Sequence, residues 1–223
     1  MRVLITAGGT REPIDAARVI ANTSTGRLGA AIAEAAAASG HEVLVLAGFH
    51  AVRPRGVRCL GFDSSADLAR LLREHVPASD AVIHAAAVSD YVPVPAAGKL
   101  SSDEPELVLR LLRAPKLIDG LRALAPAAVL VGFKLTADLP EGAQVELAEA
   151  LRRRARLDLV VVNDAGATGE HDHAALLVAD GAVCARGRGK TDIAARLVSW
   201  LGERGGAQRG PRTAGARGAG ERA

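Results

Sequence analysis

The sequence predicts an α/β fold, a Rossmann-like, mainly parallel sheet with helices on both faces, together with a lid loop and a small hairpin. Short β-branched runs alternate with alanine-rich and leucine-rich helical patterns along most of the chain. This alternation implies right-handed crossovers and a sheet that is covered on both sides. Aromatic residues make up only 2% of the chain, so Ala, Val and Leu must fill the core, as is common in parallel sheets.

The expected elements follow in a regular order. Strand 2–7 is an apolar run that ends at two glycines, and the next helical pattern begins only about fifteen residues later. The rest of the first half contains helix 25–39, strands 42–47 and 56–61, helix 65–75 and strand 80–85. A loop at 86–106 precedes strand 107–112, helix 115–124, strand 128–133, helix 143–156, strand 157–162, a hairpin around Asp180 and Gly181, and helix 190–203.

Length and charge predict one domain with a short tail. With 223 residues, 49% of them hydrophobic, the chain can bury one substantial core, which we place in a single domain at 1–203. Residues 204–223 are rich in Gly, Ala and Arg without apolar periodicity, and they are expected to be disordered. The net charge of +3 comes from this end, because without the five arginines and two glutamates of residues 202–223 the chain is neutral. A nucleic-acid partner is therefore not expected.

The sequence also predicts where the protein works. No apolar run approaches the ~18 residues of a membrane span, and the first strand begins at residue 2, which leaves no room for a signal peptide. Cys59 and Cys184 belong to no paired metal-binding or redox motif, so reduced thiols are expected. These features predict a cytoplasmic protein without a membrane partner.

The loop after the first strand is too long and too polar for a dinucleotide fingerprint. Its glycines would let two backbone segments approach one ligand closely, and they are Gly8, Gly9, Gly26 and Gly29. Ser24 or Thr25 is expected to cap the following helix, whose free N–H groups and dipole make a natural seat for a phosphate. A plain helix cap without a ligand is the alternative reading.

A second loop begins at the end of strand 80–85. The small residues Ala85, Ala86 and Ala87 would leave room for a ligand to lie against the backbone, and Asp90 could hold Mg²⁺ or a hydroxyl group. A simple turn residue is the alternative for Asp90. His84 lies inside the apolar run, which favours a packed side chain over a catalytic base.

The segment 93–105 contains small, polar and turn-forming residues around a single cation, Lys99. This composition predicts a mobile lid that brings Lys99 to a polyphosphate, and a solvated loop is the alternative. The chain has 24 arginines and four lysines, so each lysine is worth scrutiny; they are Lys99, Lys116, Lys134 and Lys190. Phe133 and Asn163 end two further strands at the same edge, where they could contact a base or ribose, and core packing is the alternative for Phe133.

Two enzyme classes can be compared on these residues. A nicotinamide-dependent reductase would need a tight glycine turn after the first strand and an acid at the end of the second, but strand 42–47 ends at Gly48. A Tyr-x-x-x-Lys pair and the P-loop spacing are also absent from the sequence. Phosphate binding is therefore favoured over hydride transfer. An NAD(P)-dependent reductase and a non-catalytic nucleotide-binding regulator remain the alternatives.

At these residues the chain resembles the phosphopantothenoylcysteine synthetases, which are the phosphopantothenate–cysteine ligases of coenzyme A biosynthesis. The resemblance covers about residues 3–200 and rests on four motifs in the family's order: TAGGTREPID at 6–15, NTSTGRLG at 22–29, AAAVSDY at 85–91 and VGFK at 131–134. It implies that the carboxylate of 4′-phosphopantothenate attacks the α-phosphate of CTP, and that cysteine then displaces CMP from the acyl-cytidylate.

The resemblance also implies roles for particular residues. Asn22 matches the asparagine that supports breakdown of the intermediate, and Lys99 matches the lid lysine. The implied nucleotide contacts are Gly8, Gly9, Ser24, Gly26, Gly29, Asp90, Lys99, Pro115, Lys116, Leu117, Ile118, Phe133 and Asn163. Ala86, Ala87 and Asp90 are implied to lie between nucleotide and pantothenate, with Asn22 at the acyl group.

This sequence departs from the family's pattern at two places. The lid lacks the family's lysine cluster, and arginines at 152–154 and 156 stand where members tend to carry lysines. Arginine does not simply replace lysine at a phosphate, and CTP rather than ATP is the nucleotide that the resemblance implies. The resemblance further implies a homodimer. It also implies a free-standing ligase without flavin, whose decarboxylation partner is a separate protein.

Overall fold

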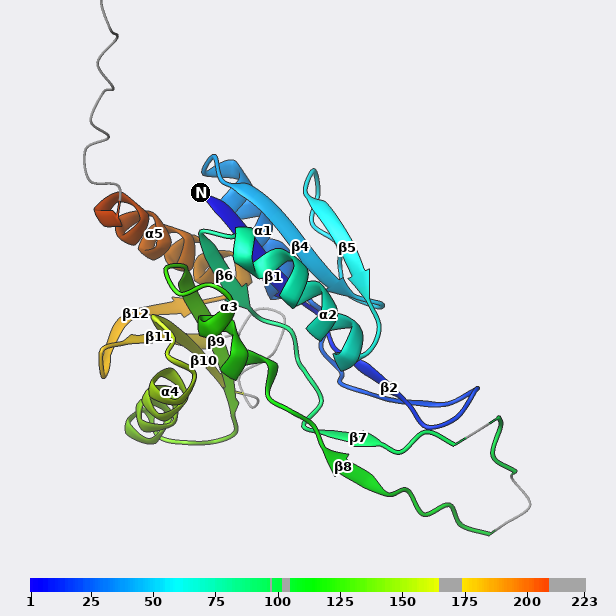
Figure 1. Cartoon of the computed structure of the whole chain (residues 1–223). Helices are drawn as coiled ribbons and strands as arrows, with labels where there is room; N and C mark the ends of the chain where they lie inside the picture. The colour runs from blue at the N-terminus through cyan, green and yellow to red at the C-terminus, as the bar shows by residue number, and fades with distance from the viewer. Residues whose placement is uncertain (97, 102–104, 165–173, 209–223) are drawn as a thin grey trace, which may run out of the picture.

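The computed structural model describes residues 1–96, 98–101, 105–164 and 174–208 (Figure 1). The expected tail at 204–223 therefore lies mostly outside the described residues, and so do four positions of the expected lid. Among the described residues, no helix is long and apolar enough to cross a membrane. Cys59 and Cys184 are free thiols.

The centre of the molecule is an eight-stranded sheet in the order β12-β11-β10-β9-β6-β1-β4-β5. Six strands run parallel, and β11 and β12 continue the sheet antiparallel at one side. The strands are β1 (Arg2–Ala7), β4 (Glu42–Gly48), β5 (Arg58–Phe62), β6 (Ala81–His84), β9 (Val129–Thr136), β10 (Leu159–Asp164), β11 (Ala174–Ala179) and β12 (Ala182–Arg188). The strand order reverses between β1 and β6, which is where ligands bind in open α/β sheets.

Helices cover both faces of this sheet, which confirms the predicted fold class. Helices α1 (Arg27–Ala38) and α5 (Lys190–Gln208) pack on one face, against alternate strand residues such as Ile5. The other face packs against α2 (Ser65–His75), α3 (Leu121–Leu124) and α4 (Glu141–Ala155), through residues such as Leu4. Because successive strand residues point to opposite faces, one short apolar run fills both cores.

Several predicted boundaries were wrong. The first helix begins at Arg27 rather than residue 25. The helix expected at 115–124 is a short 3₁₀ turn, Leu117–Gly120, followed by α3. A second 3₁₀ turn, Val76–Ala78, follows α2. The strand expected at 107–112 is β8 (Leu111–Arg113), which pairs with β7 (Tyr91–Pro93) outside the main sheet. The long first loop contains a further hairpin, β2 (Arg11–Pro13) and β3 (Val19–Ala21). Strands of three residues are too short to show a period of two.

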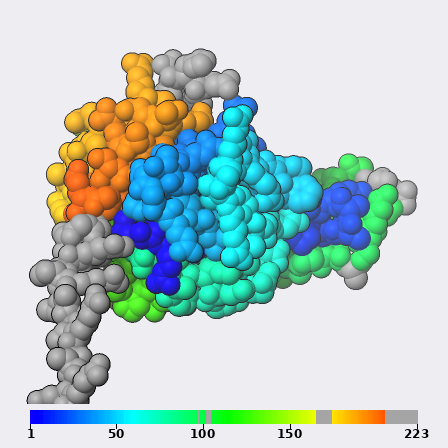
Figure 2. All heavy atoms as spheres, turned by 90° about the horizontal axis from the view of Figure 1, so that it is seen from above, coloured from blue at the N-terminus to red at the C-terminus, as the bar shows by residue number. Residues whose placement is uncertain are grey.

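These short ribbons form an arm that projects from the body, which we define as residues 11–21 and the described part of 91–113 (Figure 2). Asp15 is buried within it, and its carboxylate accepts hydrogen bonds from the backbone N–H groups of Ala17 at 2.8 Å and Leu100 at 3.1 Å. Its other donors are the N–H and guanidinium of Arg18. The Ala17 hydrogen bond in particular lowers the pKa of Asp15. Asp15 thus joins residues 98–101 to the hairpin β2–β3.

The base of the arm is joined to α2. Glu12 is buried, and its Oε1 accepts the Ser65 N–H at 3.0 Å where α2 begins. Arg11 pairs with Asp63 at 3.3 Å. The charged residues at positions 11, 12, 15 and 18 therefore build the arm, whereas the second half of the loop, from Asn22 onward, returns to the sheet.

Glu149 joins α4 to the turn between β11 and β12. Its carboxylate accepts from Arg152 at 2.8 and 2.9 Å, from Arg153 at 2.8 Å and from the Gly181 N–H at 3.2 Å. These donors, Arg152 first, lower its pKa from 4.5 to about 2. A depressed carboxyl pKa means that this stabilisation is complete above pH 4.5 and is lost as the pH falls toward 2.

We therefore expect Glu149→Gln to lower the free energy of unfolding at pH 7 and to make it less dependent on pH between 4.5 and 2. Urea unfolding at a series of pH values measures both effects. Glu146→Gln, an exposed position on the same helix, is the matched control and should change neither. A Glu149→Gln variant with the stability and pH profile of the wild type would contradict the role given to this carboxylate.

Candidate active site

The pairing of β1 with β6 continues past the ends of both strands. The Ala87 N–H donates to the Gly8 carbonyl at 2.8 Å, and the Thr10 N–H donates back to the Ala87 carbonyl at 3.1 Å. Thr10 and Ser89 are both buried, with their hydroxyl oxygens 2.9 Å apart, and the Ser89 N–H donates to Thr10 Oγ1 at 3.1 Å. The two loops at the switch point are therefore one hydrogen-bonded unit, which we call the loop junction (residues 8–10 and 85–89).

Gly9 permits a further chain segment to pack on the loop junction. A Cβ at Gly9 would lie 2.5 Å from the carbonyl oxygen of Asn22, so no larger residue fits there. Asn22 is thereby placed beside the end of β6, and its Nδ2 donates to the Ala87 carbonyl at 2.8 Å and to Ser89 Oγ at 3.3 Å. The asparagine singled out in the sequence thus lies directly against the small residues 85–87.

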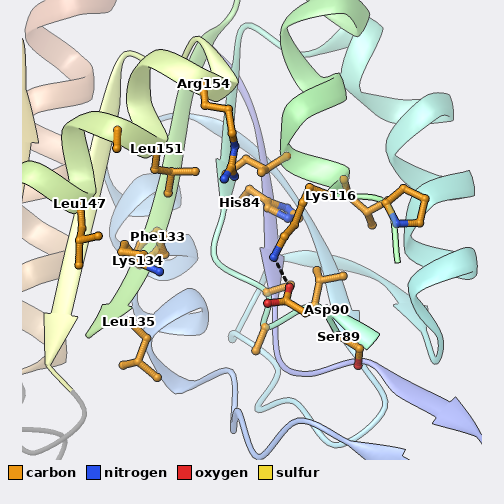
Figure 3. A pocket seen from close by; sticks show the side chains of 17 residues that line it. His84, Ser89, Asp90, Lys116, Phe133, Lys134, Leu135, Leu147, Leu151 and Arg154 are labelled. Atoms are coloured by element: carbon orange, nitrogen blue, oxygen red, sulfur yellow. Dashed lines mark hydrogen bonds and ion pairs between the residues drawn. The ribbon is translucent and has the colours of Figure 1, made fainter. Parts of the chain in front are cut away.

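One pocket, the α4 pocket, opens on the α4 side of the loop junction, with a volume of about 630 Å³ (Figure 3). Three cations, Lys116, Lys134 and Arg154, line it, and Asp90 is its acidic residue, paired with Lys116 Nζ. Arg154 Nε also contacts Asp119 at 3.1 Å. Apolar side chains from α4 and β9 complete it, among them Leu147, Leu151 and Phe133. An anion with an apolar or aromatic portion fits such a lining.

A second pocket, the α1 pocket, opens on the opposite side of the sheet edge, with a volume of about 680 Å³. It lies between the start of α1 and the start of α5, and Arg27 and Lys190 are its cations. The remaining lining residues are Asn22, Thr23, Ser24, Thr25, Gly26, Leu28, Gly29, Ala85, Ala86, Ala87, Phe133, Leu135 and Asn163. The Oδ1 atom of Asn163 is buried without a hydrogen-bond partner among the described residues, so a ligand donor would satisfy it.

The start of α1 differs from the sequence prediction. The N-cap is Gly26, at φ 70°, and no side chain caps the helix, so neither Ser24 nor Thr25 takes that role. A Cβ at residue 26 would lie 2.8 Å from the Ala51 Cβ and would need a left-handed backbone, which glycine adopts most readily. The first N–H groups of α1 lack a side-chain cap beside the pocket, an arrangement that suits a phosphate.

The two pockets meet at the loop junction. Ala86, Ala87, Phe133 and Leu135 line both of them. Because residues 86 and 87 have only methyl side chains, ligands in the two pockets can approach each other closely at this point. The side-chain amide of Asn22 is bonded to the carbonyl of the same Ala87.

The structure divides the residues that the sequence assigned to one nucleotide. Asp90, Pro115, Lys116, Leu117 and Ile118 line the α4 pocket, whereas Ser24, Gly26, Gly29 and Asn163 line the α1 pocket. Gly8 and Gly9 line neither and instead shape the loop junction. Positions close in sequence to β1 and β6 thus fall into two pockets, and the assignment of all of them to one nucleotide stays a prediction.

The structure places Lys99 and Asp90 in different parts of the molecule, and their predicted roles stay predictions. Lys99 lines neither pocket and lies on the arm, where the flanking Gly98 carbonyl accepts the Ala16 N–H. Asp90 is the single carboxylate of the α4 pocket and is paired with Lys116, and the described residues contain no cluster of metal-ligating side chains. Mg²⁺ is usually held by one or two carboxylates together with substrate phosphates, so Mg²⁺ at Asp90 stays a prediction.

Several residues of the pockets were missed by the sequence analysis or only partly indicated. Arg27 and Ser89 received no role, because nothing in their local sequence marks them, and Arg154 was noted only as one of the arginines that stand where family members tend to carry lysines. Scarcity of lysine was an informative signal: Lys116 and Lys134 line the α4 pocket and Lys190 lines the α1 pocket. Three of the four lysines of the chain thus line a pocket.

A match to a family model shows to which protein family the chain belongs. Residues 1–203 match the model described as the DNA/pantothenate metabolism flavoprotein C-terminal domain. The chain belongs to this family. The match covers the whole sheet, both pockets and the arm.

Relatives agree with this family assignment. The chain is 38% identical over 180 residues to the coenzyme A biosynthesis bifunctional protein CoaBC of Thermococcus kodakarensis, covering 79% of this chain and 44% of that protein. It is 36% identical over 212 residues to CoaBC of Mycobacterium bovis, covering 88% and 51%. The chain thus spans about half the length of these curated relatives. A crystal structure of the DNA/pantothenate metabolism flavoprotein from Streptococcus pneumoniae matches with a TM-score of 0.86, 29% identity, and 92% and 99% coverage.

The loop junction predicts a measurable contribution to stability. Replacing Thr10 by valine keeps the shape but leaves the buried Ser89 N–H without its acceptor, so the free energy of unfolding should fall by about 1–3 kcal/mol. Thr10→Ser retains the hydroxyl and is the matched control. Urea unfolding measures the difference, and a valine variant as stable as the serine variant would show that these hydrogen bonds add little.

Proposed function

We propose that the protein is a ligase that joins 4′-phosphopantothenate to L-cysteine at the expense of CTP, through an acyl-cytidylate, in coenzyme A biosynthesis. The observation that carries the proposal is that two pockets of different character meet at Ala86 and Ala87, with Asn22 bonded to their shared wall. Family membership and the relatives named for coenzyme A biosynthesis support the substrate class.

We place the nucleotide in the α4 pocket. Lys116, Lys134 and Arg154 can offset the charge of a triphosphate, and the apolar side chains beside them can cover the nucleoside. Mg²⁺ enters with the nucleotide as part of the substrate, bound mainly by phosphate oxygens and water. Among the described side chains of the pocket, none accounts for a preference for cytosine over adenine. The proposal of CTP as the nucleotide therefore depends on the family resemblance.

We place phosphopantothenate in the α1 pocket. Its phosphate would lie at the N–H groups that begin α1, close to Arg27 and Lys190, because this end of the pocket is the electropositive one. The pantothenate chain can then extend along Asn163 toward the loop junction. This orientation directs the carboxylate to the wall that both pockets share.

The chemistry follows from that orientation. A carboxylate oxygen attacks the α-phosphorus of CTP, the bond to the β-phosphate breaks, and pyrophosphate leaves with its electron pair. The amino nitrogen of cysteine then attacks the acyl carbon, the C–O bond to the cytidylate breaks, and CMP leaves as the nitrogen loses a proton. Cations of the α4 pocket reduce the repulsion between the carboxylate and the phosphates in the first step.

Asn22 is suited to the second step. Of its two N–H contacts, the one to Ser89 Oγ is the longer, at 3.3 Å, and an acyl oxygen at Ala87 could replace it while the 2.8 Å bond to Ala87 keeps the amide oriented. A neutral donor stabilises the oxyanion without adding charge to a site that already holds several anions. One such donor is typically worth roughly 3 kcal/mol in the transition state.

The experiment that tests the proposed function is pyrophosphate release by the purified protein with phosphopantothenate, cysteine and Mg²⁺. We expect release with CTP that requires phosphopantothenate, and a parallel reaction with ATP measures the nucleotide preference. Oxidation of NADPH under the same conditions would favour a reductase. Binding of a nucleotide without pyrophosphate release from CTP or ATP would favour a non-catalytic regulator and would overturn the ligase proposal.

Asn22→Asp should slow the second half-reaction about a hundredfold. The substitution removes the N–H donor, and the new carboxylate faces the Ala87 carbonyl, which lies 2.8 Å from the Asn22 amide nitrogen in the wild type. Rapid-quench experiments with labelled CTP should show the acyl-cytidylate accumulating in the presence of cysteine. Asn163→Asp introduces the same charge in the same pocket and should weaken substrate binding without this accumulation. Unchanged turnover in Asn22→Asp would remove Asn22 from the mechanism.

We further propose that two copies of the chain associate through the arm, and that Lys99 serves the site of the partner. Exposed apolar side chains gather on the arm: Tyr91, Val94, Leu107, Val108, Leu111 and Leu112. Two-stranded ribbons such as β2–β3 and β7–β8 are only marginally stable without further packing. Burial against a second copy would stabilise the arm, and it would explain why Lys99 lies outside both pockets of its own chain.

Mixing two inactive variants tests this arrangement. Lys99→Gln and Asn22→Asp should each lose activity alone. If Lys99 acts in the partner, a mixed dimer has one site with both native residues, and random reassociation should restore about a quarter of the wild-type rate. No restoration in dimers shown to have exchanged subunits would mean that Lys99 acts on its own chain.

A further inference from the structure

His84 occupies an unusual position for a buried histidine. It ends β6, beside Thr6 of β1 at the point where the strand order reverses, and only 6% of it is exposed. Its ring nevertheless forms part of the α4 pocket wall, near Lys116 and Arg154 (Figure 3). His84 takes no part in the two chemical steps proposed for the ligase.

The hydrogen bonds around Thr6 decide which ring nitrogen carries a proton. Thr6 Oγ1 lies 3.0 Å from His84 Nδ1 and accepts the Ala86 N–H at 3.0 Å. Thr6 is fully buried, so its hydroxyl hydrogen needs an acceptor, and Nδ1 is the acceptor within reach. Thr6 therefore donates to Nδ1, and the proton of the neutral ring is on Nε2.

The ring is neutral under ordinary conditions. Burial lowers the pKa of His84 to about 4. The charged groups that share its pocket are the cations Lys116, Lys134 and Arg154, together with Asp90, which Lys116 already pairs. A further positive charge would thus be repelled, whereas a neutral N–H donor fits beside these groups.

We propose that His84 is a nucleotide-binding residue that donates its Nε2–H to a phosphate oxygen of the bound nucleotide, and that Thr6 is the positioning residue that fixes the ring. This inference rests on the proposed nucleotide site in the α4 pocket. An uncharged donor among three cations adds a directional hydrogen bond where further charge is not needed. Because Thr6 also accepts the Ala86 N–H, the same hydroxyl connects the donor to the wall between the pockets.

Calorimetric titration with CTP and Mg²⁺ tests the proposal. His84→Leu should weaken CTP binding on the order of tenfold. His84→Gln, which keeps an N–H donor of similar reach, should retain most of the affinity, and Thr6→Val should weaken binding while the ring remains present. Thr6→Ser keeps the hydroxyl and is the control for that variant. Between pH 6 and 8, the difference between wild type and His84→Leu should stay constant.

Nitrogen NMR of the wild-type protein gives a second readout, the protonation state of each ring nitrogen of His84. The chain has six histidines, and the His84 signals are the ones that disappear in His84→Gln. We expect Nε2 protonated and Nδ1 unprotonated from pH 6 to 8, with the Nε2 signal shifting when CTP and Mg²⁺ are added.

The two proposals fail in different ways. Equal CTP affinity of wild type, His84→Leu and His84→Gln would overturn the role of His84 and leave the nucleotide site intact. A ring that is protonated on Nδ1, or on both nitrogens at pH 7, would also overturn it. Failure of the wild-type protein to bind either CTP or ATP would overturn the nucleotide site and this inference together.

Discussion

The hydrogen-bonded junction between the loops that follow β1 and β6 is the constraint on which the rest of the site depends. Thr10, Ser89 and Ala87 fasten two segments that lie almost eighty residues apart in sequence, with contacts of 2.8 to 3.1 Å. The junction forms the wall between the two pockets and supplies the carbonyl that orients Asn22. In an open α/β sheet this switch point is where helices leave the strand ends uncovered, so a rigid wall there creates a site on each side.

The two pockets bind charge by different means. On the α4 side, cationic side chains dominate, and the single acid, Asp90, is paired with one of them. On the α1 side, the uncapped start of the helix contributes backbone N–H groups, with Arg27 and Lys190 beside them. Side-chain cations can follow a flexible triphosphate, whereas fixed backbone donors suit one phosphate in one place. This difference supports the assignment of nucleotide and phosphopantothenate to the two sides.

Much of the fold could be read from the sequence, and less of the site. The apolar runs of β1 and β10 and the periodicity of α2 and α5 appear in the sequence because each must bury a face. Asn22 was found through the family resemblance, and residues 85–87 were found because three consecutive small residues open space. The uncapped start of α1 was not found, because Ser24 and Thr25 look like caps until the left-handed turn at Gly26 is seen.

The sequence by itself determined the sheet, its covering helices and the residue types needed for chemistry on phosphates, because periodicity and composition record burial and charge directly. Only the tertiary structure decided that Ser24 and Lys116 belong to different pockets, that Lys99 lies on an arm, and that His84 faces a pocket while held by Thr6. These outcomes depend on which strands become neighbours and on which face a loop leaves. Such relations join residues far apart along the chain, and no local pattern contains them.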